Sequence, residues 1–124
     1  MSLEVKYEIP SVSHFQELLL QNPGVLIIKF GASWCGPCKR IDPVLLNYYK
    51  QMPYNVQCIV VDIDNSTEIY SFMRTKKMVS GVPALLCYIK GNHSYIPDAS
   101  TIGADPAQIK LFFQKCYDAS KQLA

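Results

Sequence analysis

Residues 34–39 have the sequence WCGPCK, which places two cysteines three positions apart between an apolar run and a helical pattern. The apolar run at residues 25–30 predicts a buried strand, and the apolar spacing after the hexapeptide predicts a helix that extends to about Met52. Gly36 permits a tight turn between the cysteines and Pro37 stiffens it, so the two sulfur atoms can close a small ring. The hexapeptide therefore predicts a redox-active pair where a strand passes into a helix.

The chemistry of the pair follows from its place at the start of the predicted helix. Unpaired N–H groups and the helix dipole favour an anion there, so we expect the Cys35 thiol to be exposed and to ionise readily. A thiolate attacks disulfides, and Cys38 is placed to resolve the mixed disulfide that results.

The alternative for these two cysteines is half of a structural zinc site. Such a site needs four ligands, but the sequence has no second close cysteine pair, and His14 and His93 fall in separate predicted elements. We therefore expect no metal. We also expect no organic cofactor, because no glycine-rich phosphate-binding loop is present.

Length and composition predict one compact domain covering residues 1–124. The chain is 49% hydrophobic and 18% charged, with a net charge of +2, which is typical of a globular protein. Because it has no basic run, we expect neither a nucleic-acid nor a membrane partner. A monomer is also expected. The first residues do not resemble a signal peptide and the apolar runs are too short to span a bilayer, so a cytoplasmic protein is expected.

The cysteine count favours a reducing compartment. There are five cysteines, an odd number, whereas a secreted scaffold of this size more often carries an even set. Three of them lie in apolar segments and are expected to be buried thiols: Cys58, Cys87 and Cys116.

The rest of the pattern predicts an α/β fold in which helices cover both faces of a central mixed sheet. Further strands are expected at residues 56–63 and 84–89. Gly91 suggests a hairpin turn into a last strand near Ser94, with irregular loop at residues 97–103.

Helices are predicted where a capping residue precedes an apolar stripe. Ser13 is expected to cap the first helix, a later helix covers about residues 66–75, and Asp105 caps the last. Pro43 lies inside the long helix and should bend it, and a weak alternation at residues 5–9 predicts an edge strand.

This order of elements around WCGPCK resembles the thioredoxin family over nearly the whole chain. Trp34 matches the family's approach to its active site, Pro43 matches its helix-kinking proline, and residues 81–83 match its Gly-hydrophobic-Pro segment. The resemblance implies a thioredoxin fold and a thiol–disulfide oxidoreductase that reduces protein disulfides, with Cys35 as nucleophile and Cys38 as resolving cysteine. It also implies an electron donor such as a thioredoxin reductase.

The same resemblance implies a substrate groove beside Cys35. In the family, the proline that corresponds to Pro83 is cis and lies against the cysteines, and the backbone at Val82 would pair with an extended substrate segment. A glycine that corresponds to Gly103 helps to shape the groove, and Trp34 would form part of its rim.

Three residues near the predicted site depart from the family pattern. Lys29 stands where the family has a buried aspartate, and Val60 stands where the neighbouring strand usually carries that aspartate's charged partner. Gly31 replaces an aromatic residue or a serine and opens space beside the strand. A buried ammonium without a partner is costly, so it tends to lose its proton or to find a carboxylate.

These departures leave the role of Lys29 and the direction of the reaction open. A protonated Lys29 would stabilise a nearby thiolate and make the protein more oxidising, whereas a neutral one would be a substitute base. A local bulge that turns Lys29 to solvent is the third interpretation. The alternatives to a reductase are accordingly an oxidase or isomerase-like variant, and an adaptor whose groove holds a partner without redox turnover.

Overall fold

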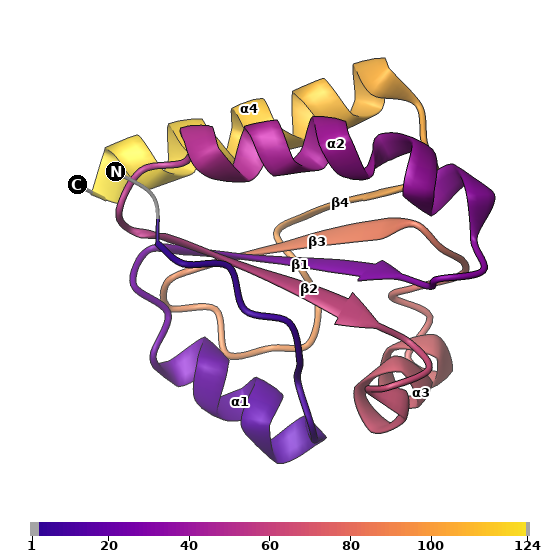
Figure 1. Ribbon diagram of the computed structural model, residues 1–124. Coiled ribbons are helices and arrows are strands. Elements are labelled where there is room, and N and C mark those ends of the chain that lie inside the picture. Colours follow the sequence, from indigo (N-terminus) through magenta and orange to yellow (C-terminus); the bar gives the residue numbers. More distant parts are fainter. Residues whose placement is uncertain (1–2, 124) are drawn as a thin grey trace.

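The computed structural model describes residues 3–123. Within this range the elements are, in chain order, α1 (Val12–Leu20), β1 (Val25–Gly31), α2 (Gly36–Gln51), β2 (Val56–Asp62), α3 (Thr67–Thr75), β3 (Ala84–Ile89), β4 (Ala99–Ile102) and α4 (Pro106–Leu123). Figure 1 shows α2 and α4 on one face of the sheet and α1 and α3 on the other. The predicted α/β fold with helices on both faces is confirmed.

The sheet has the strand order β2-β1-β3-β4. β1 lies parallel to β2 and antiparallel to β3, and β3 lies antiparallel to β4. The predicted mixed sheet is confirmed, although its antiparallel part includes the β1–β3 pair as well as the final hairpin. Every residue of β1 is buried, because this strand has a neighbour on each side and helices over each face.

The pleat of β1 decides which helices its side chains meet, because successive side chains point to opposite faces. One alternating set belongs to the core beneath α1 and α3: Leu26, Ile28 and Phe30. The other set belongs to the core beneath α2 and α4: Val25 and Ile27. Lys29 has the parity of the second set, so the strand directs this charged side chain toward the helix that begins at the cysteines.

Two expectations for the first part of the chain are wrong. Ser11, not Ser13, is the N-cap of α1; it has the extended backbone that an N-cap requires, and its Oγ accepts the backbone N–H of His14 at 3.0 Å. The predicted edge strand is reduced to one bridge between Lys6 and Ile59.

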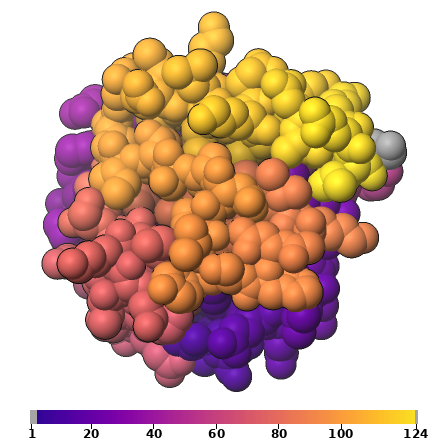
Figure 2. Space-filling model, turned by 180° about the vertical axis from the view of Figure 1, so that it is seen from behind, coloured from indigo at the N-terminus to yellow at the C-terminus, as the bar shows by residue number. Residues whose placement is uncertain are grey.

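The predicted position of the last strand is also wrong, since β4 begins at Ala99 rather than near Ser94. The turn at Gly91 is present, but the side chains after it bind the loop's own backbone. Asn92 Oδ1 accepts the N–H of Ser94 at 2.9 Å, and Ser94 Oγ accepts the N–H of Ile96 at 3.0 Å. Figure 2 shows this orange segment on the surface, between α4 in yellow and α1 in indigo.

Candidate active site

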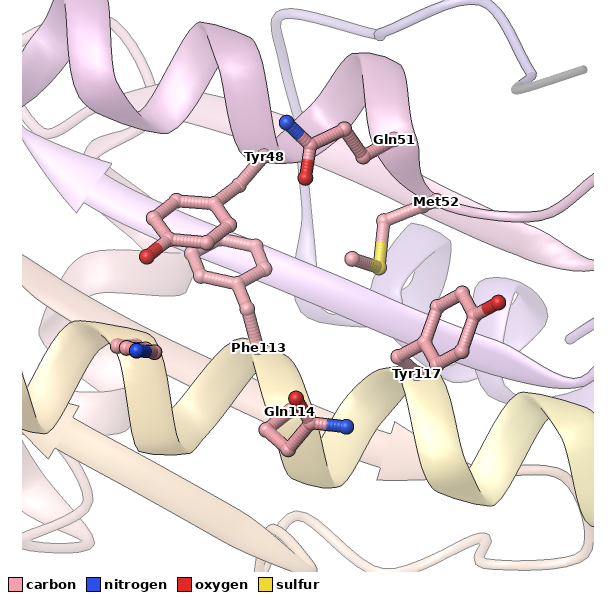
Figure 3. A pocket seen from close by; sticks show the side chains of 7 residues that line it. Tyr48, Gln51, Met52, Phe113, Gln114 and Tyr117 are labelled. Atoms are coloured by element: carbon pink, nitrogen blue, oxygen red, sulfur yellow. The ribbon is translucent and has the colours of Figure 1, made fainter.

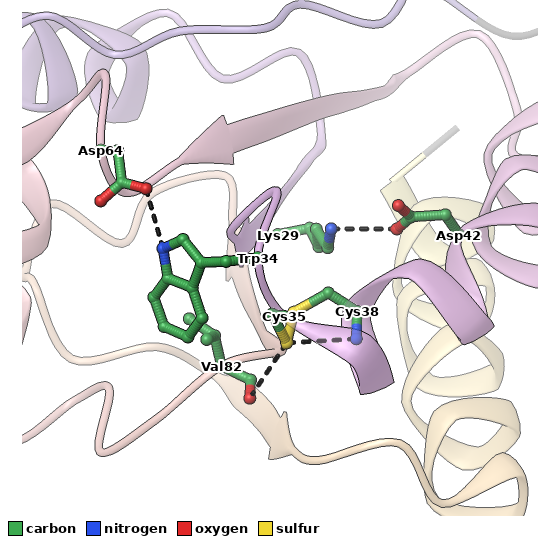
Figure 4. Close-up of a disulfide and its surroundings, with 7 residues drawn as sticks. All are labelled: Lys29, Trp34, Cys35, Cys38, Asp42, Asp64 and Val82. Atoms are coloured by element: carbon green, nitrogen blue, oxygen red, sulfur yellow. Dashed lines mark hydrogen bonds and ion pairs between the residues drawn. A yellow bond between two sulfur atoms is a disulfide. The ribbon is translucent and has the colours of Figure 1, made fainter.

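A disulfide joins Cys35 and Cys38 at the first turn of α2 (Figure 4). Their Cα atoms are 5.3 Å apart, within the usual range for bonded cysteines. Cys35 is the N-cap of α2, and its Sγ accepts the backbone N–H of Cys38 at 3.2 Å. Gly36 and Pro37 form the turn between them and begin the helix. The helix N-terminus therefore directs an N–H donor and the positive end of its dipole at the Cys35 sulfur.

Cys35 is a buried residue. Cys35 is only 5% exposed, so the exposure predicted from its sequence position is wrong. Its Sγ is bonded to Cys38 and lies 3.8 Å from the carbonyl oxygen of Val82, and these neighbours account for the burial. The Val82 segment is therefore the part of the chain after α2 that lies directly against the Cys35 sulfur.

The groove residues indicated by the resemblance lie around this segment. The Val82–Pro83 peptide bond is cis, and the Pro83 carbonyl oxygen accepts the N–H of Gly103 at 2.8 Å. Gly103 has a φ of +103°, a backbone conformation that favours glycine. Trp34 is 66% exposed, and its Nε1–H donates to Asp64 Oδ2 at 2.9 Å, which orients the indole ring beside the disulfide.

Lys29 is buried and paired, so the bulge that would turn it to solvent is not present. It is 5% exposed, and its Nζ donates to Asp42 Oδ1 of α2 at 3.0 Å. In the register of the sheet Lys29 lies opposite Val60, so the neighbouring strand supplies no charged partner at that position. The carboxylate comes from the helix instead, and its side chain is 53% exposed.

Gly31 lies between this ion pair and the disulfide, and its lack of a side chain leaves space that both of them border. A Cβ atom built on Gly31 would collide with the Lys29 Nζ and would lie 3.6 Å from the Cys38 Sγ. The ammonium and the sulfur therefore border the same small space above Gly31. A pocket of about 380 Å³ opens beside it, and its lining includes Lys29, Asp42 and Asp62.

Asp42 is the site residue that the sequence interpretation missed. A signal for it exists, because Asp42 follows Cys38 by four residues and residues at that spacing lie on one face of a helix. The pleat places Lys29 on the face of β1 that α2 covers. The two periodicities together point to the pair.

The other three cysteines are buried and unpaired, as predicted: Cys58, Cys87 and Cys116. Burial raises the pKa of Cys58 to about 12. A hydrogen bond with Cys87, and then burial, raises the pKa of Cys116. Cys58 and Cys116 therefore stay protonated at neutral pH and are poor nucleophiles. Among residues 3–123 no group of three or more histidine, cysteine or acidic side chains is arranged to hold a metal ion.

A second pocket, of about 470 Å³, lies between α2 and α4 and away from the cysteine pair (Figure 3). Tyr48 from α2 stacks on Phe113 from α4 with ring centroids 4.5 Å apart, so these aromatic residues pack the two helices together. No reactive group of the disulfide site lines this pocket.

Comparison with known proteins places the chain in a family. A family model described as Thioredoxin matches residues 7–115. Thioredoxin-1 of Saccharomyces cerevisiae is 30% identical over 103 residues, which cover 83% of this chain and 90% of the relative. The chain belongs to the thioredoxin family. Family membership and the Cys35–Cys38 disulfide make it a thiol–disulfide oxidoreductase of the disulfide-reductase class.

Solved thioredoxin structures have the same fold. The thioredoxin of Trichomonas vaginalis superposes with a TM-score of 0.74 at 25% identity, covering 90% of this chain and 96% of its own. Mitochondrial thioredoxin 3 of S. cerevisiae gives a TM-score of 0.71 at 25% identity, covering 89% and 94%. Within the described part of the chain, no helix has the length and apolar character needed to cross a membrane.

Proposed function

We propose that the chain reduces disulfide bonds of protein substrates by dithiol exchange, with Cys35 as nucleophile and Cys38 as resolving cysteine. The observation that carries this assignment is the position of the Cys35 Sγ. It accepts a helix N-terminal N–H at 3.2 Å and lies beside the Val82 carbonyl oxygen. The first contact stabilises a thiolate, and the second marks where a substrate backbone would lie.

The reaction then proceeds by two exchanges of sulfur partners. The Cys35 thiolate attacks one substrate sulfur, and the other substrate sulfur leaves as a thiolate that takes a proton from solvent. Cys38 loses its proton to solvent and attacks the Cys35 sulfur, which releases the second substrate thiolate and closes the Cys35–Cys38 disulfide. Two electrons pass to the substrate, and an external electron donor restores them.

Substrates would bind in an extended conformation across the Trp34–Val82–Gly103 surface. Val82 precedes the first paired residue of β3, so its backbone lies outside the ladder of the sheet. Trp34 presents a large exposed ring whose indole N–H is already bound to Asp64. These features suit a polypeptide segment that pairs with the Val82 backbone and packs against the indole.

The cellular setting that fits this activity is electron transport in the cytoplasm by a single-domain monomer. Three buried thiols that remain unpaired suit a reducing compartment. A thioredoxin reductase would be the electron donor, and disulfide-containing proteins the partners.

The test is a protein-disulfide reduction assay with dithiothreitol as electron donor. We expect turnover by the native sequence and none above background by Cys35→Ser. The Cys38→Ser variant should accumulate a mixed disulfide between Cys35 and the substrate, visible by mass spectrometry. An absence of turnover and of trapped complex would leave the adaptor function instead.

The direction of the reaction needs a second measurement, because the buried Lys29 ammonium favours a more oxidising protein. Equilibration of the Cys35–Cys38 couple with glutathione gives its reduction potential. A potential near or below the cytosolic glutathione value supports a reductase. A potential near those of dedicated oxidants would support the oxidase or isomerase-like alternative.

A further inference from the structure

The two sulfur atoms of the disulfide have different neighbours. The Cys35 Sγ lies against Val82, on the side where Trp34 is exposed. The Cys38 Sγ borders the space above Gly31 that also holds the end of the Lys29 side chain. In Figure 4 the Lys29–Asp42 pair and the Val82–Trp34 pair accordingly lie on different sides of the disulfide. The buried cation is therefore placed to act on the resolving cysteine.

The ammonium reaches this position because of two other residues. Gly31 has no side chain, and any Cβ atom there would occupy the place of the Lys29 Nζ. Asp42 accepts a hydrogen bond from the ammonium and supplies the opposite charge that compensates the buried cation. The position of the Lys29 ammonium therefore depends on both Gly31 and Asp42.

We propose that Gly31 and Asp42 are positioning residues that hold the Lys29 ammonium against Cys38, where it stabilises the Cys38 thiolate and raises the reduction potential of the couple. This inference rests on the proposed role of Cys38 as resolving cysteine. Opening the disulfide takes two electrons from an external dithiol and leaves two sulfurs that bind protons or remain thiolates. A cation beside one of them stabilises the reduced form relative to the neutral disulfide.

Other charged or titratable groups also face this part of the molecule. Those that line the pocket beside Cys38 are Tyr7 from the N-terminal segment, Lys39 and Asp42 from α2, and Asp62 from β2. Lys39 is an exposed side chain on the helix surface, whereas Lys29 is buried and borders the space next to the Cys38 sulfur. Lys29 is therefore the cation expected to have the larger effect on the Cys38 thiolate, since solvent screens exposed charges.

The test is a double-mutant cycle of Gly31→Ala and Lys29→Met. Gly31 has no positive φ, so its backbone conformation is open to alanine, while the new Cβ displaces the ammonium without changing any charge. We expect each single variant to shift the equilibrium with glutathione about tenfold toward the disulfide, which is about 30 mV for a two-electron couple. In the Lys29→Met background, Gly31→Ala has no cation to displace and should shift the equilibrium less than twofold.

The ionisation of Cys38 alone gives the second readout. In a Cys35→Ser background, carbon-13 NMR of the Cys38 Cβ should show the thiolate forming at higher pH in both Gly31→Ala and Lys29→Met. Equal effects of Gly31→Ala with and without Lys29 would overturn the proposal, because the glycine would then act through structure alone. No shift in Lys29→Met would overturn it as well.

If Gly31→Ala does not fold, Asp42→Ala takes its place in the same cycle, since it releases the ammonium from its anchor. Asp118→Ala on α4 is the matched control, an exposed carboxylate on an element that does not contribute to this pocket, and should leave the equilibrium unchanged. The Cys38→Ser trapping experiment depends on Cys35 only. If Cys38→Ser traps a mixed disulfide but the variants of the cycle leave the equilibrium with glutathione unchanged, only the positioning proposal is refuted. If no mixed disulfide is trapped, the proposed function is refuted.

Discussion

Asp42→Asn and Lys29→Met each remove the charge of one partner of the same ion pair. The structure predicts that they change the free energy of unfolding by different amounts. The Lys29 side chain is 6% exposed and that of Asp42 is 53% exposed. Asparagine keeps an oxygen that accepts the ammonium's hydrogen bond, so Asp42→Asn removes only the charge and leaves a buried cation without its counter-ion. Lys29→Met replaces the cation by an apolar chain of similar length and leaves a carboxylate that water can solvate.

The size of the difference follows from the 3.0 Å separation of Nζ and Oδ1. Coulomb's law gives about 5.5 kcal/mol for this distance at an effective dielectric constant of ~20, and about 1.4 kcal/mol in bulk water. Because one partner is half in solvent, we expect Asp42→Asn to lower the free energy of unfolding by about 2 kcal/mol. Lys29→Met also removes the cost of burying an ammonium, so its effect should lie between no change and a stabilisation of about 1 kcal/mol.

Urea unfolding of the oxidised protein at pH 7 and low salt measures both changes. Lys39→Met is the matched control, because this exposed lysine of α2 forms no ion pair with a carboxylate within residues 3–123, and it should shift stability by less than about 0.5 kcal/mol. A loss of stability in Lys29→Met that equals or exceeds the loss in Asp42→Asn would refute the reasoning. The Lys29–Asp42 pair would then stabilise the fold by more than the cost of burying the ammonium.

Three further outcomes are expected. Iodoacetamide at pH 8 should label at most two sulfurs of the reduced native protein and all five in urea, because the other three thiols are buried, and a third label in the native state would contradict this. Burial raises the pKa of Cys58 from 9.0 to about 12, so the unfolded chain loses this proton at lower pH than the folded protein does. The free energy of unfolding should therefore fall between about pH 9 and pH 12. Urea midpoints should show a shallower fall in Cys58→Ala. Trp34→Ala should change stability by less than about 0.5 kcal/mol, because the ring is 66% exposed, but raise the KM for a protein disulfide severalfold, and an unchanged KM would remove Trp34 from the substrate surface.

The sequence predicted those elements whose signals are local. The hexapeptide, the apolar runs of β1 to β3 and the Asp105 cap, whose Oδ1 accepts the N–H of Ala107 at 3.0 Å, need no knowledge of the rest of the chain. β4 was misplaced because the decision between strand and loop depends on side-chain contacts of Asn92 and Ser94 that the alternation of apolar residues does not report.

The active site divides in the same way. Cys35 and Cys38 were predicted because their spacing alone determines whether a ring can close. The partner of Lys29 was not predicted, since it required the parity of β1 and the register of α2 at once. The burial of Cys35 was missed for a related reason, because it depends on a segment near Val82 that is 47 residues away in the sequence.

A buried charge on β1 can be kept in more than one way. The resemblance indicates an aspartate at the position of Lys29 and a charged partner on the neighbouring strand, whereas this chain carries the cation on β1 and the carboxylate on α2. An aspartate is short, but a lysine must extend along the strand surface, and a Cβ at position 31 would block its end. Lys29, Gly31 and Asp42 thus depend on one another in this chain. Lys29→Asp alone would place a second carboxylate on the face of β1 that α2 and Asp42 cover, so the exchange of Asp42 as well is needed to avoid two uncompensated negative charges there.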